Sequence, residues 1–226
     1  MKVNFNEEKN IWHKGYERVV GLDEAGRGPL AGPVVASAVM VRQFKISNLK
    51  FKINDSKKIS AKNREKIYEI LINHPDIRWG IGIVSEKVID KINILEATKL
   101  AMQKAIINLQ NNFSLSYNGR RKEGKSLNVD FLLIDGNFSL QAEVPQKSII
   151  KGDQKVFSIC AAGIIAKVTR DKVMEKMHKK YPNYGFHKHK GYGTSLHIKN
   201  LQKFGPCKIH RKSFFPVSAL AKSEFI

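Results

Sequence analysis

Three separated segments of the 226-residue chain place a carboxylate close behind a short apolar run. Asp23 and Glu24 follow RVVGL, Asp135 follows FLLI, and Asp153 follows a third apolar stretch across a Lys-Gly turn. In α/β sheets, functional groups gather beyond the carboxyl ends of the strands, where side chains leave the packed sheet. Oxygen-rich clusters of this kind suit Mg²⁺ or Mn²⁺ and require no His or Cys. The pattern therefore predicts a metal site, with Asp23 beside Asp135 if their strands are parallel neighbours.

An ordinary structural role is the alternative for each of these acids. A single acid at such a position is more often a turn residue, a helix cap or a solvated charge. Asp153 precedes an expected helix, where it would favour the positive helix end. The joint arrangement favours a metal site, because the chain has 40 Lys+Arg and only 20 Asp+Glu. The pattern alone leaves both interpretations open.

Composition limits the class of protein. Hydrophobic residues make up 42% of the chain, which excludes global disorder, and the net charge is +20. A basic excess of this size favours a polyanionic partner, with nucleic acid first among the possibilities. No apolar run approaches the roughly 18 residues of a membrane span, and no signal-peptide core precedes the first strand. Cys160 and Cys207 stand outside any CxxC pattern, so a reducing, cytoplasmic compartment is expected.

Hydrophobic spacing predicts one mixed α/β domain over residues 17–226, after a short lead-in at 1–16 and with a C-terminal tail from about 181. The expected order is β-β-α-β-α-β-β-α. Residues 116–126 are polar, basic and glycine-containing, which is typical of a loop. Strands are expected at 18–22, 34–41, 78–84, 131–134 and 148–150, and helices after a cap at 60, and at 92–109, 156–179 and 195–204.

Two further segments have the composition of substrate-binding elements. Gly26-Arg27-Gly28 follows the first two acids, and its glycines permit positive φ and the close approach of a nucleic-acid backbone. A tight turn between two strands explains the same tripeptide. Tyr192 lies in a basic, aromatic segment that could contact a substrate. The common alternative for such a residue is an interface aromatic whose hydroxyl group is solvated. Several lysines are candidate phosphate contacts, although each one alone is typical of a solvated surface: Lys57, Lys58, Lys188 and Lys190.

Longer stretches around these residues resemble the ribonuclease HII family, the second type of ribonuclease H. The signature is GLDEAGRGPLAGPVVASAV at 21–39, and the matched region extends over about residues 17–217. Five more segments match in the same order: NDSKKIS at 54–60, LLIDGN at 132–137, KGDQKVFSICAAGIIAKVTRD at 151–171, YPNYGFHKHKGYGT at 181–194 and HRKSFFPV at 210–217.

The resemblance implies a ribonuclease H-like fold, with a mixed five-stranded sheet, helices on both sides and a helical C-terminal region. It implies an endoribonuclease that cuts the RNA of RNA–DNA hybrids and incises at single ribonucleotides in duplex DNA. Two divalent ions about 3.5–4 Å apart would support an in-line displacement that leaves 5′-phosphate and 3′-hydroxyl ends. A monomer is expected. By matching motif, the catalytic and metal-binding acids are Asp23, Glu24, Asp135 and Asp153.

The resemblance also implies roles in substrate binding. Gly26-Arg27-Gly28 would contact the ribonucleotide through its 2′-hydroxyl, the group that distinguishes RNA from DNA. Tyr192 would pack on the following deoxyribose. Of the candidate phosphate contacts, which rest on charge alone, Lys57 is assigned to the substrate-binding site. Nearby histidines are not expected to bind metal, because their spacing fits no helical His pair with a third ligand: His187, His189 and His197.

Two positions depart from the family pattern, and two rival functions remain. Cys160 and Gly163 stand where the family more often has alanine and serine; neither is expected to touch the acids.

Type 3 ribonuclease H is the near rival in function, but it carries an extra N-terminal domain and a glutamate as the fourth acid. A non-catalytic hybrid-binding module is the other, and four acids in the phosphate path argue against it. The remaining acids are assigned to the solvated surface, with a structural role inside the long helix as the alternative for Asp171: Asp90, Glu96, Asp130, Glu143 and Asp171.

Overall fold

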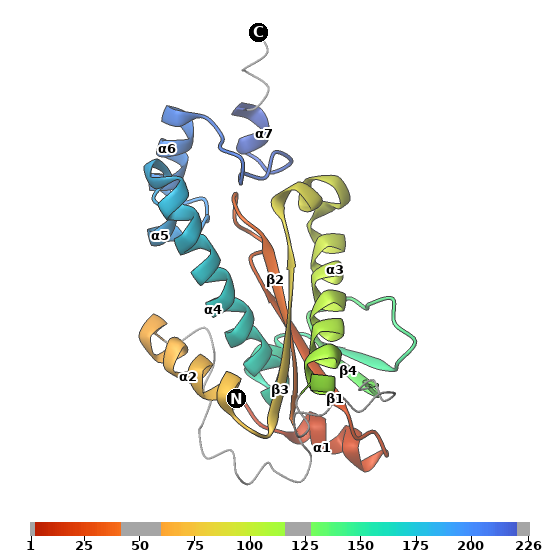
Figure 1. The fold of residues 1–226 in the computed structure, drawn as a ribbon. Coiled ribbons are helices and arrows are strands. Elements are labelled where there is room, and N and C mark those ends of the chain that lie inside the picture. The colour runs from red at the N-terminus through yellow and green to blue at the C-terminus, as the bar shows by residue number, and fades with distance from the viewer. Residues whose placement is uncertain (1–2, 42–59, 116–127, 221–226) are drawn as a thin grey trace.

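The computed structural model describes residues 3–41, 60–115 and 128–220, and its centre is a mixed five-stranded sheet (Figure 1). The strand order is β3-β2-β1-β4-β5. β1 pairs with β2 and β2 with β3 in antiparallel fashion, whereas β1–β4 and β4–β5 are parallel. The expected α/β class and five-stranded mixed sheet are therefore confirmed. The strands are β1 (Val19–Ala25), β2 (Val34–Val41), β3 (Ile77–Val84), β4 (Phe131–Asp135) and β5 (Gln146–Ile149).

Long helices cover both faces of the sheet, and short ones form the C-terminal region at one end (Figure 1). The long helices are α2 (Ala61–Asn73), α3 (Glu86–Leu115) and α4 (Phe157–Lys180). The shorter elements are α1 (Asn6–His13), η3 (Gly152–Gln154), η4 (Pro182–Tyr184), α5 (Phe186–His189), α6 (Ser195–Phe204) and α7 (Val217–Leu220). In the described residues, no helix is long and apolar enough to cross a membrane.

Strand alternation divides the core into two layers. Val20 and Leu22 of β1 pack in the cluster formed with α3, on one face of the sheet. Their neighbours in β1 point to the other face, because successive side chains alternate. There Gly21 lies directly under α4; a Cβ on Gly21 would lie 2.5 Å from the Ser158 hydroxyl oxygen. The next residue on this face of β1 is Asp23, so its side chain also points toward α4.

The lead-in contains a helix that is part of the core. Ile11 and Trp12 of α1 are buried against β1, β4 and the start of α4. Glu8, also buried, accepts a hydrogen bond from the Ser158 backbone N–H at 2.8 Å. An acid at a helix N-terminus satisfies a free N–H group and interacts favourably with the helix dipole. Residues of α1 thus help to fix the beginning of α4.

The element boundaries differ most from the expectation at β1 and α3. β1 continues to Ala25, so Asp23 and Glu24 lie within the strand, as its third-last and second-last residues, and do not follow its end. Asp23 pairs with Ser37 of β2 and Glu24 with Ala36, and this pairing keeps the backbone extended. The helix expected from residue 92 begins at Glu86 and is broken at Asn93 (φ 64°).

The side chain of Asn93 accounts for that break. Its Oδ1 accepts hydrogen bonds from the backbone N–H groups of Leu95 and Glu96 at 2.9 and 3.1 Å. This is the geometry of a helix N-cap, so the longer part of α3 starts afresh after Asn93. The hydrophobic pattern had indicated only this second part.

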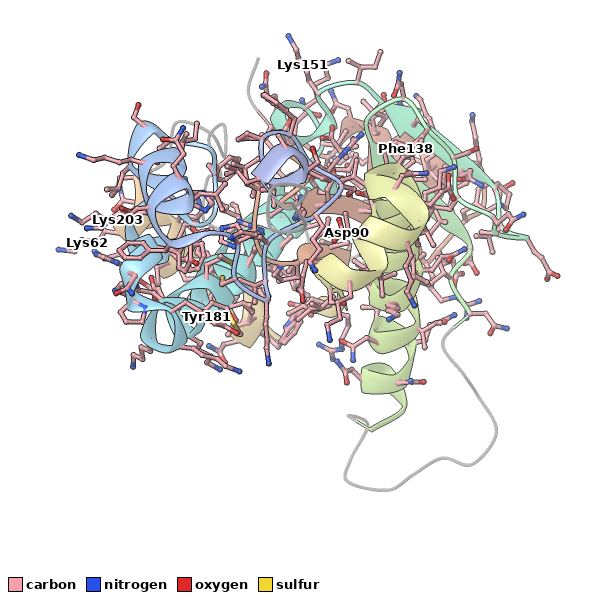
Figure 2. All side chains as sticks on the ribbon, turned by 90° about the horizontal axis from the view of Figure 1, so that it is seen from above. Lys62, Asp90, Phe138, Lys151, Tyr181 and Lys203 are labelled. Carbon is pink, nitrogen blue, oxygen red and sulfur yellow. The ribbon has the colours of Figure 1, made fainter. Side chains whose placement is uncertain are left out.

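Two acids assigned to the surface instead hold backbone in place, which corrects that expectation. Asp90 of α3 accepts hydrogen bonds from the N–H groups of Lys212 and Ser213, both at 2.9 Å, between α3 and the C-terminal segment (Figure 2). Asp130 accepts from the Arg18 N–H at 3.0 Å and forms an ion pair with its guanidinium at 3.2 Å. Asp90 therefore ties the C-terminal region to α3, and Asp130 fixes the entry into β1.

Candidate active site

Asp23 and Asp135 lie on neighbouring parallel strands, on the same face of the sheet. The β1–β4 register pairs Gly21 with Leu133 and Leu22 with Ile134, so Asp23 and Asp135 are the next residues on each strand. Leu133 packs with the α4 side of the core, and alternation gives Asp135 the same side. The predicted proximity of these two carboxylates is confirmed.

Asp153 reaches the same place from the turn that precedes α4. It lies in η3 and is buried, with 3% of its surface exposed. The N–H of Gly152 donates a 2.7 Å hydrogen bond to Asp135 Oδ1, which joins this turn to the end of β4. A Cβ on Gly152 would lie 3.3 Å from the same oxygen, so glycine permits the close approach. The third acidic segment is therefore anchored to the second.

The two carboxylate oxygens of Glu24 differ in their surroundings. Its Oε1 lies 3.5 Å from Arg27 Nη1. Its Oε2 is buried and has no hydrogen-bond partner in the described residues. An unsatisfied buried carboxylate oxygen is costly unless a cation or donor reaches it. Arg27 therefore partners one oxygen of Glu24, and the other oxygen is buried without a partner in the described residues.

Burial and mutual repulsion favour the protonated form of two acids. Burial first, then the negative charges of Glu24, Asp135 and Asp153, hold the pKa of the Asp23 carboxyl well above its usual range. Burial raises the pKa of Glu24 to about 7; Arg27 opposes that shift and Asp135 adds to it. Like charges gathered in a partly dry site behave in this way when no positive charge lies among them.

The donor set fits hard divalent cations in kind. The candidate ligands are four carboxylates, with no histidine or cysteine among them. Mg²⁺ and Mn²⁺ prefer oxygen ligands of this kind. The buried, unpartnered oxygen of Glu24 and the raised pKa of Asp23 fit a cluster whose negative charge Arg27 offsets only in part. Within the described ranges, no three His, Cys, Asp or Glu side chains are grouped closely enough to hold an ion as they stand. A cation would therefore have to draw the carboxylates together.

The loop after β1 is held from beneath by a buried arginine near the C-terminus. Arg211 is fully buried, and its guanidinium donates to the carbonyls of Gly26 (2.6 Å), Arg27 (2.8 Å) and Gly32 (3.0 Å). Burial, and then the charge of Arg170, lowers the pKa of Arg211 to about 9. In a trans peptide, C=O and N–H point in opposite directions. The N–H groups of Arg27 and Gly28 therefore point away from Arg211.

A second buried arginine, Arg170 of α4, supports the rest of this loop. It donates to the carbonyls of Pro33 (3.0 Å), Ala31 (3.1 Å) and Lys190 (2.9 Å). Gly26 has φ +101°, and a Cβ there would lie only 2.1 Å from Arg170 Nε. Glycine at position 26 is thus required both by the backbone conformation and by the guanidinium packed against it.

Tyr192 lies on the far side of the same loop. Its ring is 42% exposed, and Gly28 would contact it through a Cβ at 3.9 Å. The Lys167 ammonium and the Arg170 guanidinium each lie 5.8 Å from the ring centroid. A half-exposed ring beside cations is typical of a surface that receives a ligand.

One cleft of about 340 Å³ joins these groups. It contains residues from β1, the following loop, α2, η3 and α4. Asp135 stands next to it through Gly152 and Asp23. The cleft therefore combines acids, glycines, cations and an aromatic ring: Asp23, Glu24, Ala25, Gly26, Arg27, Gly28, Arg64, Asp153, Gly163, Ile164, Lys167 and Tyr192.

The lysines expected to contact phosphate have different outcomes. Lys57 and Lys58 lie outside the described residues. Lys190 is engaged within the protein, since its ammonium bonds to Glu175 at 3.0 Å and to the His187 carbonyl at 2.8 Å. Lys188 is exposed. Arg64 and Lys167, which sequence reasoning did not single out, line the cleft instead.

Gly163 corrects an expectation. It was expected not to touch the acids, yet it lies directly opposite Asp23, and a Cβ there would be 2.2 Å from Asp23 Oδ2. The missing side chain therefore affects the site before it affects stability. Cys160, one turn earlier, is buried in the core between α4 and the sheet.

Like Arg64 and Lys167, Arg170 and Arg211 are residues around the site that sequence reasoning missed. Arginine is almost never fully buried without partners, so nothing in the hydrophobic pattern indicated that both lie inside. A signal existed, because both belong to segments that match the family, KVTRD and HRKSF. Their roles become visible only when the six carbonyls they serve are seen.

The comparisons with known proteins agree with this geometry. The family model described as Ribonuclease HII matches residues 20–217. A ribonuclease HII of Chlamydia caviae is 52% identical over 210 residues, covering 93% of this chain and 90% of its own. That of Chlamydia trachomatis serovar A is 50% identical over 216 residues, with the same coverages.

Solved structures show the same fold. The crystal structure of ribonuclease H2 from Pyrococcus horikoshii superposes with a TM-score of 0.67 at 26% identity, covering 91% of this chain and 97% of that one. Bst-RNase HIII in complex with Mn²⁺ gives 0.64 at 14% identity, covering 91% and 69%. The carboxylates, the loop beside them and the matches over most of the chain lead to one conclusion: this protein belongs to the ribonuclease HII family, metal-dependent endonucleases that hydrolyse the RNA of RNA–DNA hybrids.

Proposed function

We propose that this chain, besides cutting RNA–DNA hybrids, incises at single ribonucleotides embedded in duplex DNA and leaves 5′-phosphate and 3′-hydroxyl ends. The observation that carries the proposal is the common cleft of the acids, the Gly26–Gly28 loop and Tyr192. The acids are proposed to supply the chemistry of cleavage, and the loop and the ring beside them to supply contacts to one nucleotide and to its neighbour.

The loop is proposed to recognise the ribonucleotide. Arg211 holds the carbonyls of Gly26 and Arg27 inside the protein, which turns the N–H groups of Arg27 and Gly28 outward. Outward N–H groups on a rigid loop are suitable donors to a 2′-hydroxyl, and glycine removes the Cβ that would block the sugar. Tyr192 is proposed to pack on the deoxyribose that follows, so a DNA residue at that position is favoured.

Asp23, Glu24, Asp135 and Asp153 are proposed to hold two divalent cations. When bound, the cations would supply an activated water and stabilisation of the leaving 3′-oxygen. The chain's own part is to present carboxylate oxygens from β1, β4 and η3, and to hold Asp135 in place through the Gly152 N–H. Arg27 forms an ion pair with one oxygen of Glu24, and the other oxygen has no hydrogen-bond partner in the described residues. We propose Mg²⁺ or Mn²⁺, in line with the hard oxygen donors.

The proposed substrate explains the charge of the chain. Each phosphate that Lys or Arg neutralises releases counterions, and this supplies much of the affinity for nucleic acid. Arg64 and Lys167 stand at the cleft, and Lys57 is retained as a proposed phosphate contact. A monomer working in a reducing, cytoplasmic compartment is also proposed; the two free thiols, Cys160 and Cys207, accord with the compartment.

Incubation of the pure protein with a duplex that contains one ribonucleotide tests the proposal. The arms are with and without Mg²⁺ or Mn²⁺, with an all-DNA duplex and a continuous hybrid alongside. We expect a single cut at the ribonucleotide, only with metal, and none in the all-DNA duplex. Mapping the ends distinguishes a 5′-phosphate from a 5′-hydroxyl product. Cleavage of the hybrid without incision at the single ribonucleotide would overturn the proposal.

A further inference from the structure

Three histidines of the C-terminal region are buried together behind Tyr192. They are His189 of α5, His197 of α6 and His210 from the segment after α6. The rings of His189 and His197 stack at 4.4 Å between centroids, and His197 and His210 follow at 5.2 Å. None of the three lines the cleft. Their role is therefore not contact with the substrate.

Hydrogen bonds determine which nitrogen of His197 carries its proton. His197 Nδ1 lies 2.9 Å from the carbonyl oxygen of Tyr192, and a carbonyl only accepts, so Nδ1 must donate. His197 Nε2 lies 3.0 Å from His210 Nε2. In a neutral His197, Nε2 carries no proton and accepts, so His210 Nε2 is the donor.

The same reasoning extends the chain to Cys207. With its proton on Nε2, His210 must accept at Nδ1, and the backbone N–H of Cys207 donates there at 2.9 Å. The Cys207 thiol lies 3.2 Å from the same nitrogen. One consistent set of tautomers thus satisfies every bond from Cys207 through His210 and His197 to the Tyr192 carbonyl.

The chain requires neutral rings. A protonated His197 would present N–H groups to both partners, and one of them, His210, already donates. Burial lowers the pKa of His197 to about 4; burial and then His197 lower that of His210 to about 4. The groups facing these rings include His189 and the carbonyls of Tyr192 and Tyr184. The geometry and the low basicity agree.

The backbone around Tyr192 is held at successive groups. His189 Nδ1 accepts from the Gly191 N–H at 3.2 Å, and the Gly191 carbonyl accepts from the Leu30 N–H at 2.8 Å. The Tyr192 carbonyl receives His197 and the Thr194 N–H. Leu30 belongs to the segment that Arg170 and Arg211 support at Ala31 and Gly32. The Tyr192 backbone is therefore joined to the loop that flanks the acids.

We propose that His197 and His210 are positioning residues, which hold the Tyr192 ring at the distance from the Gly26–Gly28 loop that a single ribonucleotide and its following deoxyribose require. This rests on the proposed role of Tyr192. The two histidines act through the Tyr192 carbonyl and contact no reacting atom. Their loss therefore affects discrimination between substrates more than cleavage itself.

Two substitutions at His197 separate positioning from simple packing. The Asn side chain places its amide N–H where His has Nδ1–H, so His197→Asn keeps the donor to Tyr192 and loses the bond to His210. His197→Gln extends to the Nε2 position and keeps a partner for His210, but loses the donor to Tyr192. Exposed His13 on α1 supplies the control variant His13→Gln.

The readout is the ratio of kcat/KM on a single-ribonucleotide duplex to kcat/KM on a continuous hybrid, with the thermal midpoint of each variant. A lost bond to a neutral carbonyl corresponds to about a fivefold change, so His197→Gln should lower the ratio by about that factor. His197→Asn and His13→Gln should stay within about twofold of the unsubstituted protein. Equal ratios in the Asn and Gln variants would overturn the proposal, whatever their thermal midpoints.

A second measurement does not depend on activity. The ¹⁵N shifts of the histidine rings distinguish the two neutral tautomers and the charged form. We expect Nδ1–H at His197 and Nε2–H at His210 at neutral pH. An Nε2–H tautomer at His197 would overturn the chain even if incision is observed. If instead the expected tautomers are found but no variant or parent incises at a single ribonucleotide, the proposed function fails and the positioning of the Tyr192 backbone stands.

Discussion

Gly163 of α4 leaves the space in which the Asp23 carboxylate lies, since a Cβ at position 163 would be 2.2 Å from Asp23 Oδ2. The helix therefore has no side chain at the point where it crosses the end of β1. A mid-helix glycine costs up to about 1 kcal/mol relative to alanine. Stability and site geometry therefore make opposite demands at this residue.

Gly163→Ala should separate the two demands. Alanine improves the helix, but the Asp23 carboxylate must move to accommodate the methyl group. We expect a thermal midpoint that is unchanged or up to about 2–4 °C higher, with cleavage that needs more metal for half-maximal rate. The measurements are a melting curve and a Mg²⁺ titration of hybrid cleavage. Asn111→Ala, at an exposed position of α3 away from the site, is the control for improved helix propensity. An unchanged Mg²⁺ titration in Gly163→Ala would show that the Asp23 position is immaterial.

Asp135→Asn should abolish cleavage while preserving the fold. The amide keeps the shape and can still accept from the Gly152 N–H, but it removes a negative charge from the proposed metal site. We expect turnover to fall by about a hundredfold or more, with the thermal midpoint retained or raised. Glu96→Gln on the exposed face of α3 is the matched control and should cleave normally. Near-normal turnover in Asp135→Asn would contradict the assignment of this acid.

The raised pKa of Glu24 predicts how stability depends on pH without metal. Glu24 ionises at about 7 in the folded chain, against a usual value of 4.5. Between these values the unfolded chain has lost the proton and the folded chain keeps it, so this contribution to stability falls as pH rises. We expect the thermal midpoint in chelator to decline less between pH 5 and pH 8 in Glu24→Gln than in the unsubstituted protein. Mg²⁺ should raise the midpoint more at pH 8 than at pH 5.

Two buried histidines change the stability of the protein with pH in the direction opposite to Glu24. Burial lowers the pKa of His197 and His210, so their contribution to stability is lost as pH falls below their usual value of 6.5. The comparison with Glu24→Gln removes this background, because both proteins contain the same histidines. Identical pH slopes in the two proteins would contradict the raised pKa of Glu24.

Tyr192→Ala should discriminate between substrates. The ring has no proton to give or take in the proposed hydrolysis, and its proposed task is packing on a deoxyribose. Stacking of this kind is worth roughly 1–3 kcal/mol, or about a five- to hundredfold larger loss on the single-ribonucleotide duplex than on the hybrid. Tyr192→Phe should keep most of the discrimination. Equal losses of kcat/KM on both substrates would mean that Tyr192 only supports the fold.

Arg211→Lys should weaken cleavage of both substrates. Lysine keeps the charge but lacks the planar fork that serves the carbonyls of Gly26, Arg27 and Gly32. Each hydrogen bond to a charged group contributes about 1.5–3 kcal/mol, so losing even one predicts at least about a tenfold lower rate through a displaced loop. Rates are measured well below the thermal midpoint. Arg18→Lys, at a partly exposed ion pair, is the control and should cleave within about twofold of the parent.

The strands and the meeting of Asp23 with Asp135 could be predicted because both follow from local patterns. Apolar runs of four to eight residues indicate buried strands, and parallel neighbours bring equivalent ends together. The extension of β1 to Ala25 could not, because strand pairing with β2 overrides the polarity of Asp23 and Glu24. Local patterns carry no information on such long-range pairing.

The support beneath the site was outside the reach of sequence patterns for the same reason. Arg170 and Arg211 are stabilised by carbonyls that lie far away along the chain, and no periodicity records such partners. The contact of Gly163 with Asp23 depends on where α4 crosses β1. The histidine chain behind Tyr192 likewise required the positions of ring nitrogens, which only the three-dimensional structure gives.

The anchoring of the Gly26 carbonyl by Arg211 also has a consequence for biosynthesis. This hydrogen bond joins residues 185 positions apart. Synthesis delivers the N-terminal part first, at about 5–20 residues per second, and contacts of such long range form late. A nascent chain that already carries Asp23 and Glu24 therefore lacks the anchor of its recognition loop for tens of seconds at the slow end of that range. The Gly26–Gly28 loop therefore gains its support only when nearly the whole polypeptide has emerged, so this part of the site forms after synthesis is almost complete.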